Sequence, residues 1–354
     1  MLKRQTHTEP VTGSLPRSDV PFGSGRPLGA TLLRSLARVR DSRTGGILGA
    51  LIALAIAGSI WSPEFATVNN ASVVAQNVSQ VGVMAVGMTF VIVTAEIDLS
   101  VGSIYALAAV TSGLALEAGW PIPLAIGVAL AVGLVAGTIN GLLTVWLRLP
   151  SFIVTLGTLS VFEGTALLVA GGNPITLGRG VHDLSLFNFI AQGQLWGVIP
   201  MQLVFFILFL VVGGVLLRFT RFGYHVYATG GSPVAAKLAG IDIKAVKTVS
   251  FALSGLCAAT AGVLGLSFLD YVQGVSGQGI ELTVIAAVII GGTALFGGTG
   301  TMTGTLIGVV FLGTLSDILN LQNVSSFIET VITGIIIILA VSVDTLGLIR
   351  NRTA

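Results

Sequence analysis

Charged residues are scarce in this 354-residue chain, at 9% of the sequence, while hydrophobic residues make up 53%. A soluble globular protein carries about 25% charged residues, which keep its surface solvated. A soluble globule is therefore excluded, and so is a disordered chain, because disorder requires little apolar surface. A membrane protein remains, and the length allows about ten spans of roughly 20 residues each with short connections.

Cysteine and histidine are also scarce. The single cysteine, Cys257, lies in an apolar stretch, so a disulfide framework and a cysteine-based metal site are excluded. The three histidines, His7, His182 and His225, lie in the N-terminal tail and in connections, and no pair has metal-ligand spacing. No serine, histidine and aspartate set can be placed on one membrane face either. We therefore predict no metal site, no cofactor bound by this chain and no enzymatic activity of its own.

Residues 1–44 differ in composition from the rest. They hold eight of the 17 Lys and Arg residues but only three acidic residues. A secretory signal is one interpretation, but 44 residues before the first apolar run are too many for it. We interpret this segment as a basic, mobile cytoplasmic tail, and residues 45–350 as the transmembrane domain.

The apolar runs after the tail predict an all-α polytopic membrane protein with about ten transmembrane helices. If the spans alternate from a cytoplasmic tail, 16 Lys and Arg residues lie inside and only Arg179 lies outside, as the positive-inside rule requires. Both termini are therefore expected in the cytoplasm. The expected spans are 46–61, 72–95, 99–116, 121–147, 151–170, 198–218, 248–269, 281–297, 301–319 and 327–348.

Two similar pentapeptides suggest an internal repeat. Ser-Phe-Ile-Val-Thr at 151–155 opens the fifth span, and Ser-Phe-Ile-Glu-Thr at 326–330 opens the tenth. In the expected topology one begins inside and the other outside, as an inverted five-plus-five repeat requires. A chance match of five residues is the alternative.

Polar residues within the apolar spans are candidates for a translocation path or gate, because a charge inside the membrane usually faces a cavity or a partner. Asp98 is placed either to cap the helix expected from Leu99 or to line a gate, and both roles are compatible. Capping explains Glu96 less well. The path or gate candidates are Glu96, Asp98, Ser100, Asn140, Phe152, Thr155 and Glu163.

A glycine-rich segment covers residues 291–304. Such segments can cradle phosphate, but the phosphate-binding P-loop requires a Gly-Lys pair, and this chain has none. An unwound or re-entrant link between two short helices explains the glycines better, because they let backbones approach closely. The expected flexible glycines are Gly291, Gly292, Gly297, Gly298 and Gly300.

The 219–247 connection, the longest expected in the cytoplasm, contains a short helix. Ser232 is its expected N-cap, Pro233 its first residue and Gly240 its C-terminal stop. It is either an ordinary surface helix or the piece that docks into a cytoplasmic partner.

This connection resembles the permease subunits of bacterial ABC sugar importers, in their ribose/xylose/galactose branch. The resemblance covers nearly the whole chain after the tail, with several motifs in the same order. They are Ser62-Pro63-Glu64-Phe65 with Asn69, Ile97 to Ser103, Pro150 to Thr158, Gly223, Tyr227 to Gly231, Ala235-Ala236, Gly240-Ile241 and Gly291 to Gly304.

The resemblance implies an importer of a monosaccharide or small polyol in the bacterial inner membrane, driven by ATP hydrolysis. It implies a second permease subunit, as a homodimer or occasionally a heterodimer, a cytoplasmic ATPase that holds ATP and Mg, and a periplasmic sugar-binding protein. The lipid bilayer is a further partner, and nucleic acid is not. The implied coupling helix, which sits in a groove of the ATPase, comprises Gly231, Ser232, Pro233, Ala235, Ala236, Lys237, Ala239 and Gly240.

Two points stay open. The family often has an Asn followed by an acidic residue where this chain has Ser232-Pro233, so the detail of the ATPase contact is not carried over. The rival function is an ion-coupled secondary carrier or channel, in which Glu96, Asp98 and Glu163 serve as proton or cation sites. Pentose, hexose, polyol and autoinducer permeases are not distinguished at this level.

Overall fold

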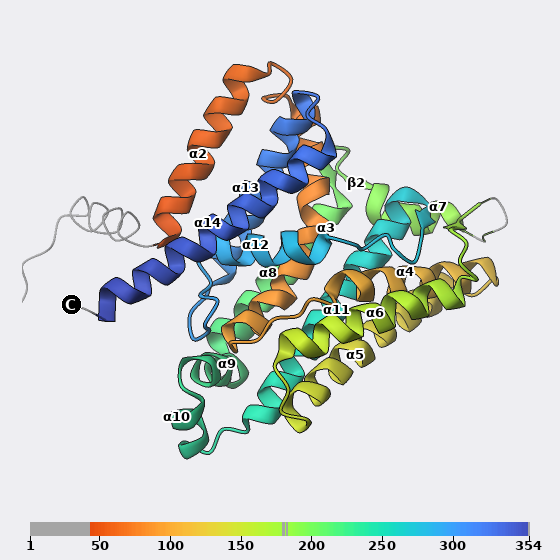
Figure 1. Ribbon diagram of the computed structural model, residues 1–354. Coiled ribbons are helices and arrows are strands. Elements are labelled where there is room, and N and C mark those ends of the chain that lie inside the picture. Colours follow the sequence, from red (N-terminus) through yellow and green to blue (C-terminus); the bar gives the residue numbers. More distant parts are fainter. Residues whose placement is uncertain (1–42, 179–180, 182, 353–354) are drawn as a thin grey trace, which may run out of the picture.

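The computed structural model describes residues 43–178, 181 and 183–352, and these are mostly helical (Figure 1). The expected N-terminal tail lies outside the described residues except for its last two positions, and so do Arg179 and His182. The helices are α2 (Arg43–Trp61), α3 (Val68–Val93), α4 (Val101–Glu117), α5 (Ile122–Trp146), α6 (Ser151–Val169), α7 (Leu184–Gln192), α8 (Met201–Phe219), α9 (Arg221–Gly231), α10 (Pro233–Leu238), α11 (Ile243–Leu269), α12 (Ile280–Ile290), α13 (Met302–Leu321) and α14 (Ser326–Arg352).

Four two-residue strands form two small antiparallel pairs in the connections. β1 (Ile175–Thr176) pairs with β4 (Tyr271–Val272), and β2 (Gln194–Leu195) pairs with β3 (Ile199–Pro200). They join connections at one end of the helical body, and no larger sheet occurs among the described residues.

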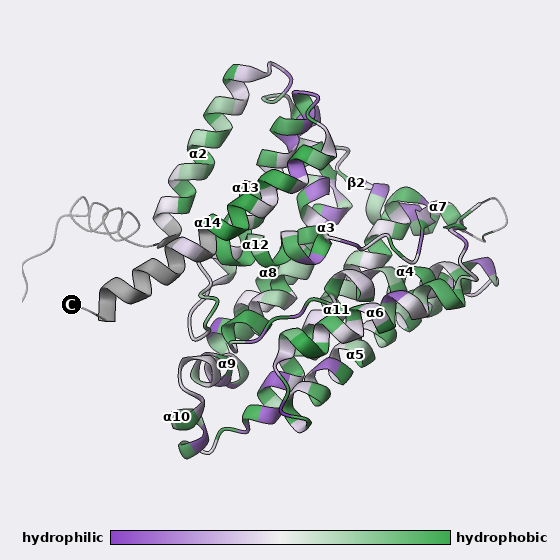
Figure 2. Cartoon of the chain, in the orientation of Figure 1, coloured by the Kyte–Doolittle hydropathy of each residue, from purple (hydrophilic) through white to green (hydrophobic). Residues whose placement is uncertain are grey.

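Six helices are long and apolar enough to cross a membrane: α3, α5, α6, α8, α11 and α13. Four shorter apolar helices accompany them, at 45–61 in α2, in α4, in α12 and at 326–339 in α14. The all-α, polytopic class is thus confirmed, whereas the count of ten spans stays a prediction. Figure 2 shows hydrophobic colouring along most of these helices, with hydrophilic segments near their ends.

Several expected boundaries were wrong. The expected span 281–297 is the 11-residue α12, because Gly291 and Gly292 end the helix there. The seventh span begins at Ile243 rather than 248, since Asp242 caps it by accepting hydrogen bonds from the backbone N–H groups of Lys244 and Ala245. The 219–247 connection holds α9 as well as α10, and α7 was not anticipated.

α3 and α11 form the centre of the molecule. α11 packs against α3, α4 and α5, while α3 packs against α8, α12 and α13. Glycines allow the closest crossings: a Cβ on Gly255 of α11 would lie 2.1 Å from the carbonyl oxygen of Gly133 in α5. Small residues at helix contacts are typical of membrane proteins, where close backbone approach replaces the hydrophobic driving force.

Candidate functional site

The α10 helix has the ends expected from its sequence. The Ser232 hydroxyl accepts a hydrogen bond from the Ala235 N–H, and Pro233 is the first helical residue. At the other end Gly240 adopts a φ of +82°, and backbone bonds run from Gly240 to Lys237 and from Ile241 to Ala236. This is the Schellman arrangement, which satisfies the last carbonyls of a helix. Gly231, one of the residues expected in the coupling helix, is the last residue of α9.

Most of α10 faces outward. Val234 is 73% exposed and Leu238 is 85% exposed, whereas Ala236 is 3% exposed and packs inward. α10 is thus a short, capped helix with two apolar side chains on its outer surface. Figure 1 places it at the tip of one end of the molecule, remote from the α2–α3 turn.

The helix before α10 is fastened to the glycine segment. The Tyr227 hydroxyl in α9 donates a 2.7 Å hydrogen bond to the Gly300 carbonyl. Gly230 lies against the Val93 carbonyl at the end of α3, and the Gly298 N–H donates to that same carbonyl at 2.9 Å. Burial raises the pKa of the Tyr227 phenol, an effect that Arg218 partly offsets, so this phenol remains a donor. α9, the end of α3 and the segment between α12 and α13 therefore form one joint.

The glycine segment itself is not helical. Residues 291–301 connect α12 to α13 through turns, with Gly292, Gly297 and Gly298 at positive φ, a region that glycine adopts without strain. Gly300 carries the carbonyl that Tyr227 binds, and Gly291 packs against Gly304. The segment is held closely by its neighbours.

A chain of hydrogen bonds crosses the interior at the α3–α4 turn. The Thr158 hydroxyl donates to the Asn140 Oδ1 at 2.7 Å, and Asn140 Nδ2 donates to the Ser100 Oγ at 2.7 Å. The Ser100 hydroxyl donates to Asp98 Oδ1 at 2.7 Å, and the Ser254 hydroxyl donates to Asp98 Oδ2 at 3.0 Å. We call these five residues the Asp98 network. Four of them are fully buried, and Thr158 is buried nearly as completely.

The donors in this network all point toward Asp98, which therefore accepts at both carboxylate oxygens. The Asp98 network joins α4, α5, α6 and α11 around the α3–α4 turn. Asp98 is not the helix cap that we expected, because α4 begins at Val101 and Ser100 occupies the cap position. Asp98 instead accepts from the Ser100 N–H at 3.0 Å, two residues on, which fixes the turn before the helix.

Two further residues of α6 hold this turn. The Ser151 hydroxyl accepts from the Ile97 N–H at 3.0 Å, and the Thr155 hydroxyl donates to the Ser151 and Ile97 carbonyls at 2.8 and 3.3 Å. Asp98, Ser100, Asn140 and Thr155 thus come together, with their hydrogen bonds made to one another and to the backbone. A closed network of this kind fixes helix positions.

The other path candidates lie apart from the network. Phe152 is exposed on α6. Glu163 accepts a 2.9 Å hydrogen bond from Gln278. Glu96 is in an ion pair with Lys247 of α11, and both side chains are largely buried. Sequence reasoning missed Lys247, whose only signal was a basic residue directly before the expected span at 248–269.

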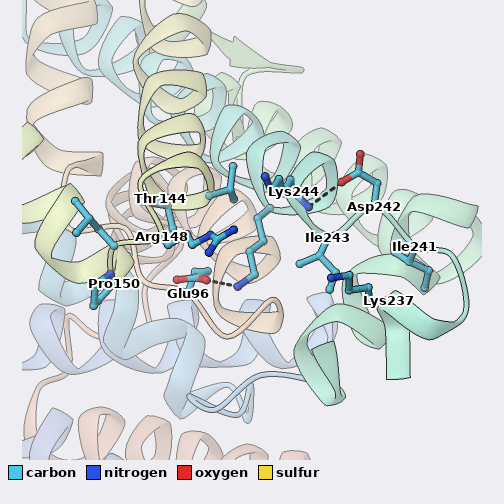
Figure 3. Close-up of a pocket in the computed structure, with 12 residues that line it drawn as sticks. Glu96, Thr144, Arg148, Pro150, Lys237, Ile241, Asp242, Ile243 and Lys244 are labelled. Carbon is cyan, nitrogen blue, oxygen red and sulfur yellow. Dashed lines mark hydrogen bonds and ion pairs between the residues drawn. The ribbon is translucent and has the colours of Figure 1, made fainter. Parts of the chain in front are cut away.

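A cavity of about 940 Å³ opens beside this ion pair, between the end of α5 and the start of α11 (Figure 3). Figure 3 shows Glu96 and Arg148 pointing into it from one side and Lys237 and Asp242 bordering the other. The lining residues are Glu96, Thr144, Val145, Arg148, Leu149, Pro150, Lys237, Ile241, Asp242, Ile243, Lys244 and Lys247.

The cavity has a positive excess. Its carboxylates are already engaged, one in the ion pair and the other, Asp242, in the bonds from the N–H groups of Lys244 and Ala245. Arg148, Lys237 and the Lys244 ammonium form no ion pair with any residue that the structure describes. No group of three or more His, Cys, Asp or Glu residues in the described ranges is arranged to hold a metal ion.

The family model for the branched-chain amino acid transport system / permease component matches residues 70–341. The chain belongs to this permease family. The ribose import permease protein RbsC of Bacillus subtilis is 42% identical over 303 residues, 85% of this chain and 92% of that one. Escherichia coli K12 RbsC is 37% identical over 298 residues, 84% and 92% of the two chains.

The autoinducer 2 import system permease protein LsrC of Yersinia enterocolitica is 33% identical over 304 residues, 85% of this chain and 82% of that one. No solved structure is significantly similar to the chain. The resemblance to sugar importer permeases is therefore confirmed. With its apolar helices, membership of the family makes this chain a multi-pass inner-membrane protein.

Proposed function

We propose that this chain is the permease subunit of an ATP-binding-cassette importer that moves a monosaccharide or related small polyol inward. ATP and Mg would be bound by a separate cytoplasmic ATPase. The observation that carries the proposal is the construction of α10, a short capped helix that exposes Val234 and Leu238 at one tip of a permease of this family.

The surface beside α10 suits an acidic partner. Arg148, Lys237 and Lys244 give the adjoining cavity a positive excess, and complementary charge guides and orients protein association. The α10 side chains would fill an apolar socket on the ATPase, while acidic groups of the ATPase would face the cavity.

Two connections would carry a displacement of α10 into the membrane. On one side, α9 is tied to the glycine segment by Tyr227 and to α3 by Gly230. On the other side, Lys247 in α11 pairs with Glu96, two residues before Asp98. Movement of α10 would thus act on the α12–α13 link and the α3–α4 turn together. Rigid-body rocking around such joints is a common way to alternate access.

We further propose ten spans in an inverted five-plus-five repeat. The pentapeptides at 151–155 and 326–330 open α6 and α14. A second pair supports the repeat: Ile-Asp-Leu-Ser-Val at 97–101 leads into α4, and Ile-Glu-Leu-Thr-Val at 280–284 opens α12. The second pair differs only by the conservative exchanges Asp98/Glu281 and Ser100/Thr283, and chance explains two aligned pairs less readily than one.

The packing of the helices also supports the proposed repeat. α11 packs on α4 and α5, and α3 packs on α12 and α13. α4 contacts α6, just as α12 contacts α14. Each half therefore contributes a central helix that packs on the third and fourth helices of the other half. This reciprocal packing supports two structurally related halves arranged about one axis.

For the assembly we propose two permease subunits, a cytoplasmic ATPase at α10 and a periplasmic binding protein at the opposite end, with both termini of the chain cytoplasmic. The ion-coupled carrier gains no support from the described carboxylates. Asp98, Glu96 and Glu163 each have a hydrogen-bonded partner, and Asp98 is shielded within its network.

Uptake by proteoliposomes tests the function. With its ATPase and binding protein, the permease should accumulate labelled sugar only when ATP and Mg are supplied on the ATPase side. Leu238→Asp should abolish ATPase binding, since a charge would enter an apolar socket, whereas Arg221→Gln in α9 should not. Uptake without the ATPase that an uncoupler collapses would instead establish the secondary carrier.

A further inference from the structure

One face of α3 carries a row of amide and hydroxyl side chains. Asn69, Ser72, Gln76 and Gln80 follow one another at intervals of three or four residues, so they lie along the same side of the helix. We call these four residues the amide face of α3. It begins at the end of the molecule opposite α10, where Figure 2 shows hydrophilic segments on α3 near β2.

The outer part of the amide face borders a groove of about 540 Å³. Gln194, in β2, lies on the groove as well, so the groove spans two separate parts of the chain. All but one of its lining residues are polar, the exception being Val73. The lining residues are Glu64, Thr67, Asn69, Asn70, Ser72, Val73, Gln76 and Gln194.

Three of the amide side chains in this groove are available for a ligand. Asn69, Gln76 and Gln194 form no side-chain hydrogen bond with any residue that the structure describes. Asn70 differs, because its Nδ2 donates to Asp317 Oδ2 at 2.6 Å and to the Phe65 carbonyl. Each free amide offers both donors and acceptors, and a sugar hydroxyl is likewise both a donor and an acceptor.

The row continues below the groove into the protein interior. Gln80 Nε2 donates to Gln202 Oε1 at 3.2 Å, and the Tyr105 hydroxyl donates to Gln80 Oε1 at 3.3 Å. Gln202 is fully buried in α8 and reaches the Ala191 carbonyl at 3.4 Å. Polar side chains thus extend from the groove at the outer end of α3 to the buried contact between α3, α4 and α8. Successive side chains of the row, three or four residues apart, are about 4.5–6 Å apart along the helix axis.

The charge of the groove restricts its ligand. Neither Lys nor Arg lines it, so the carboxylate of an amino acid or the phosphate of a sugar phosphate would have no cation there. Glu64 is the one ionisable lining group, and the hydrogen bond from Ser62 holds its pKa below the ordinary range of a glutamate. A carboxylate and several neutral amides are suited to binding uncharged hydroxyl groups.

We propose that the amide face of α3 and the groove with Gln194 form the outer cargo site, which receives a neutral polyhydroxy molecule and passes it inward by exchange of hydrogen bonds. This inference rests on the proposed function and names the residues that would serve it. Free amides at the rim would take the hydroxyl groups from water, and Gln80 with Gln202 would accept them next. Hydrogen bonds of modest strength suit a site that must release its cargo.

Uptake of labelled ribose by the reconstituted complex, with its ATPase and saturating binding protein, tests this site. Gln76→Leu and Gln194→Leu should each lower the uptake rate about threefold to tenfold, as the loss of one hydrogen bond implies. The matched control is Asn77→Leu in the same helix, since Asn77 is exposed but does not line the groove. It should change uptake less than about twofold. Sugar-independent ATP hydrolysis should stay unchanged in the Asn77→Leu control.

Cysteine labelling provides a second readout that does not require transport. The native Cys257 is buried, so Gln76→Cys should be the site that a membrane-impermeant maleimide modifies from the binding-protein side. A disulfide between two copies of this variant, with no labelling, would show that the groove is a subunit interface and would overturn the cargo site.

The outcomes separate the two proposals. If the wild-type complex transports ribose, and both groove variants transport it at the same rate as the Asn77→Leu control, the cargo site is overturned and the proposed function stands. Wild-type complex that transports leucine but no sugar would overturn the proposed function. Lower ribose uptake in the two groove variants, with labelling at position 76, would support both.

Discussion

The Tyr227 hydroxyl donates a 2.7 Å hydrogen bond to the backbone carbonyl of Gly300. This bond joins α9, which leads directly into α10, to the link between α12 and α13. Because the acceptor is a backbone atom of a segment with little secondary structure, the phenol fixes the position of the link itself. The segment next to α10 is therefore linked to the α12–α13 connection directly and not through α11.

Tyr227→Phe keeps the ring but removes this hydrogen bond. We expect a loss of about 0.5–1.5 kcal/mol in stability, together with less sugar transported per ATP hydrolysed, because the joint becomes looser. Uptake and ATP hydrolysis measured in the same proteoliposomes give this ratio. Tyr224→Phe is the control, since Tyr224 lies one turn earlier in α9 and is exposed. Equal ratios in both variants would contradict the coupling role.

The ion pair of Glu96 and Lys247 connects α11 to the turn between α3 and α4. Glu96→Gln and Lys247→Met should each destabilise the protein, and the double variant should be less impaired than the sum of the two. The coupling energy from this cycle should be about 0.5–3 kcal/mol, since the side chains are largely buried. Thermal unfolding of the four proteins in one detergent measures it. Strictly additive effects would mean that the pair contributes nothing.

Gly230 and Gly231 provide a steric test of the same joint. A Cβ on Gly230 would lie 1.8 Å from the Val93 carbonyl oxygen, so Gly230→Ala should displace α9 from α3 and cost at least about 1–3 kcal/mol. A Cβ on Gly231 would come no closer than 3.9 Å to Gly298, so Gly231→Ala should be tolerated. Yield of folded protein and unfolding temperature distinguish the two. Equal tolerance would show that α9 does not pack as described.

Much of this architecture could be predicted from the sequence because it depends on local signals. The spans follow from apolar runs, and the ends of α10 follow from Ser232, Pro233 and Gly240, whose preferences are set by the backbone. The early end of the eighth span was missed because the residues after Gly291 remain apolar, and hydropathy does not reveal a broken helix.

The candidate site was less accessible from sequence, since it depends on contacts between distant segments. Asn140 and Asp98 were singled out as polar residues in apolar surroundings, but their connection through Ser100 requires the packing of α5 on α4. Ser254 gave no local signal, and Lys247 gave only that of a basic residue directly before an apolar span. The amide face of α3 has a helical period in the sequence, but neutral amides near the end of an apolar helix do not by themselves indicate a binding site.

The Asp98 network distinguishes a structural carboxylate from a proton-carrying one. Asp98→Asn preserves shape and the acceptor for Ser100, and its new amide group can donate to the Ser254 hydroxyl. We therefore expect this variant to keep at least about half of its uptake, as a hydrogen bond exchanged for another of similar strength predicts. Asp98→Leu should be destabilised by about 1–3 kcal/mol, because the Ser100 and Ser254 donors would lose a buried partner. Uptake and unfolding temperature, measured on the same preparations, separate the two roles. Loss of uptake in Asp98→Asn at an unchanged unfolding temperature would mean that the carboxylate must titrate during transport, and an ion-coupled step would then have to be restored to the mechanism.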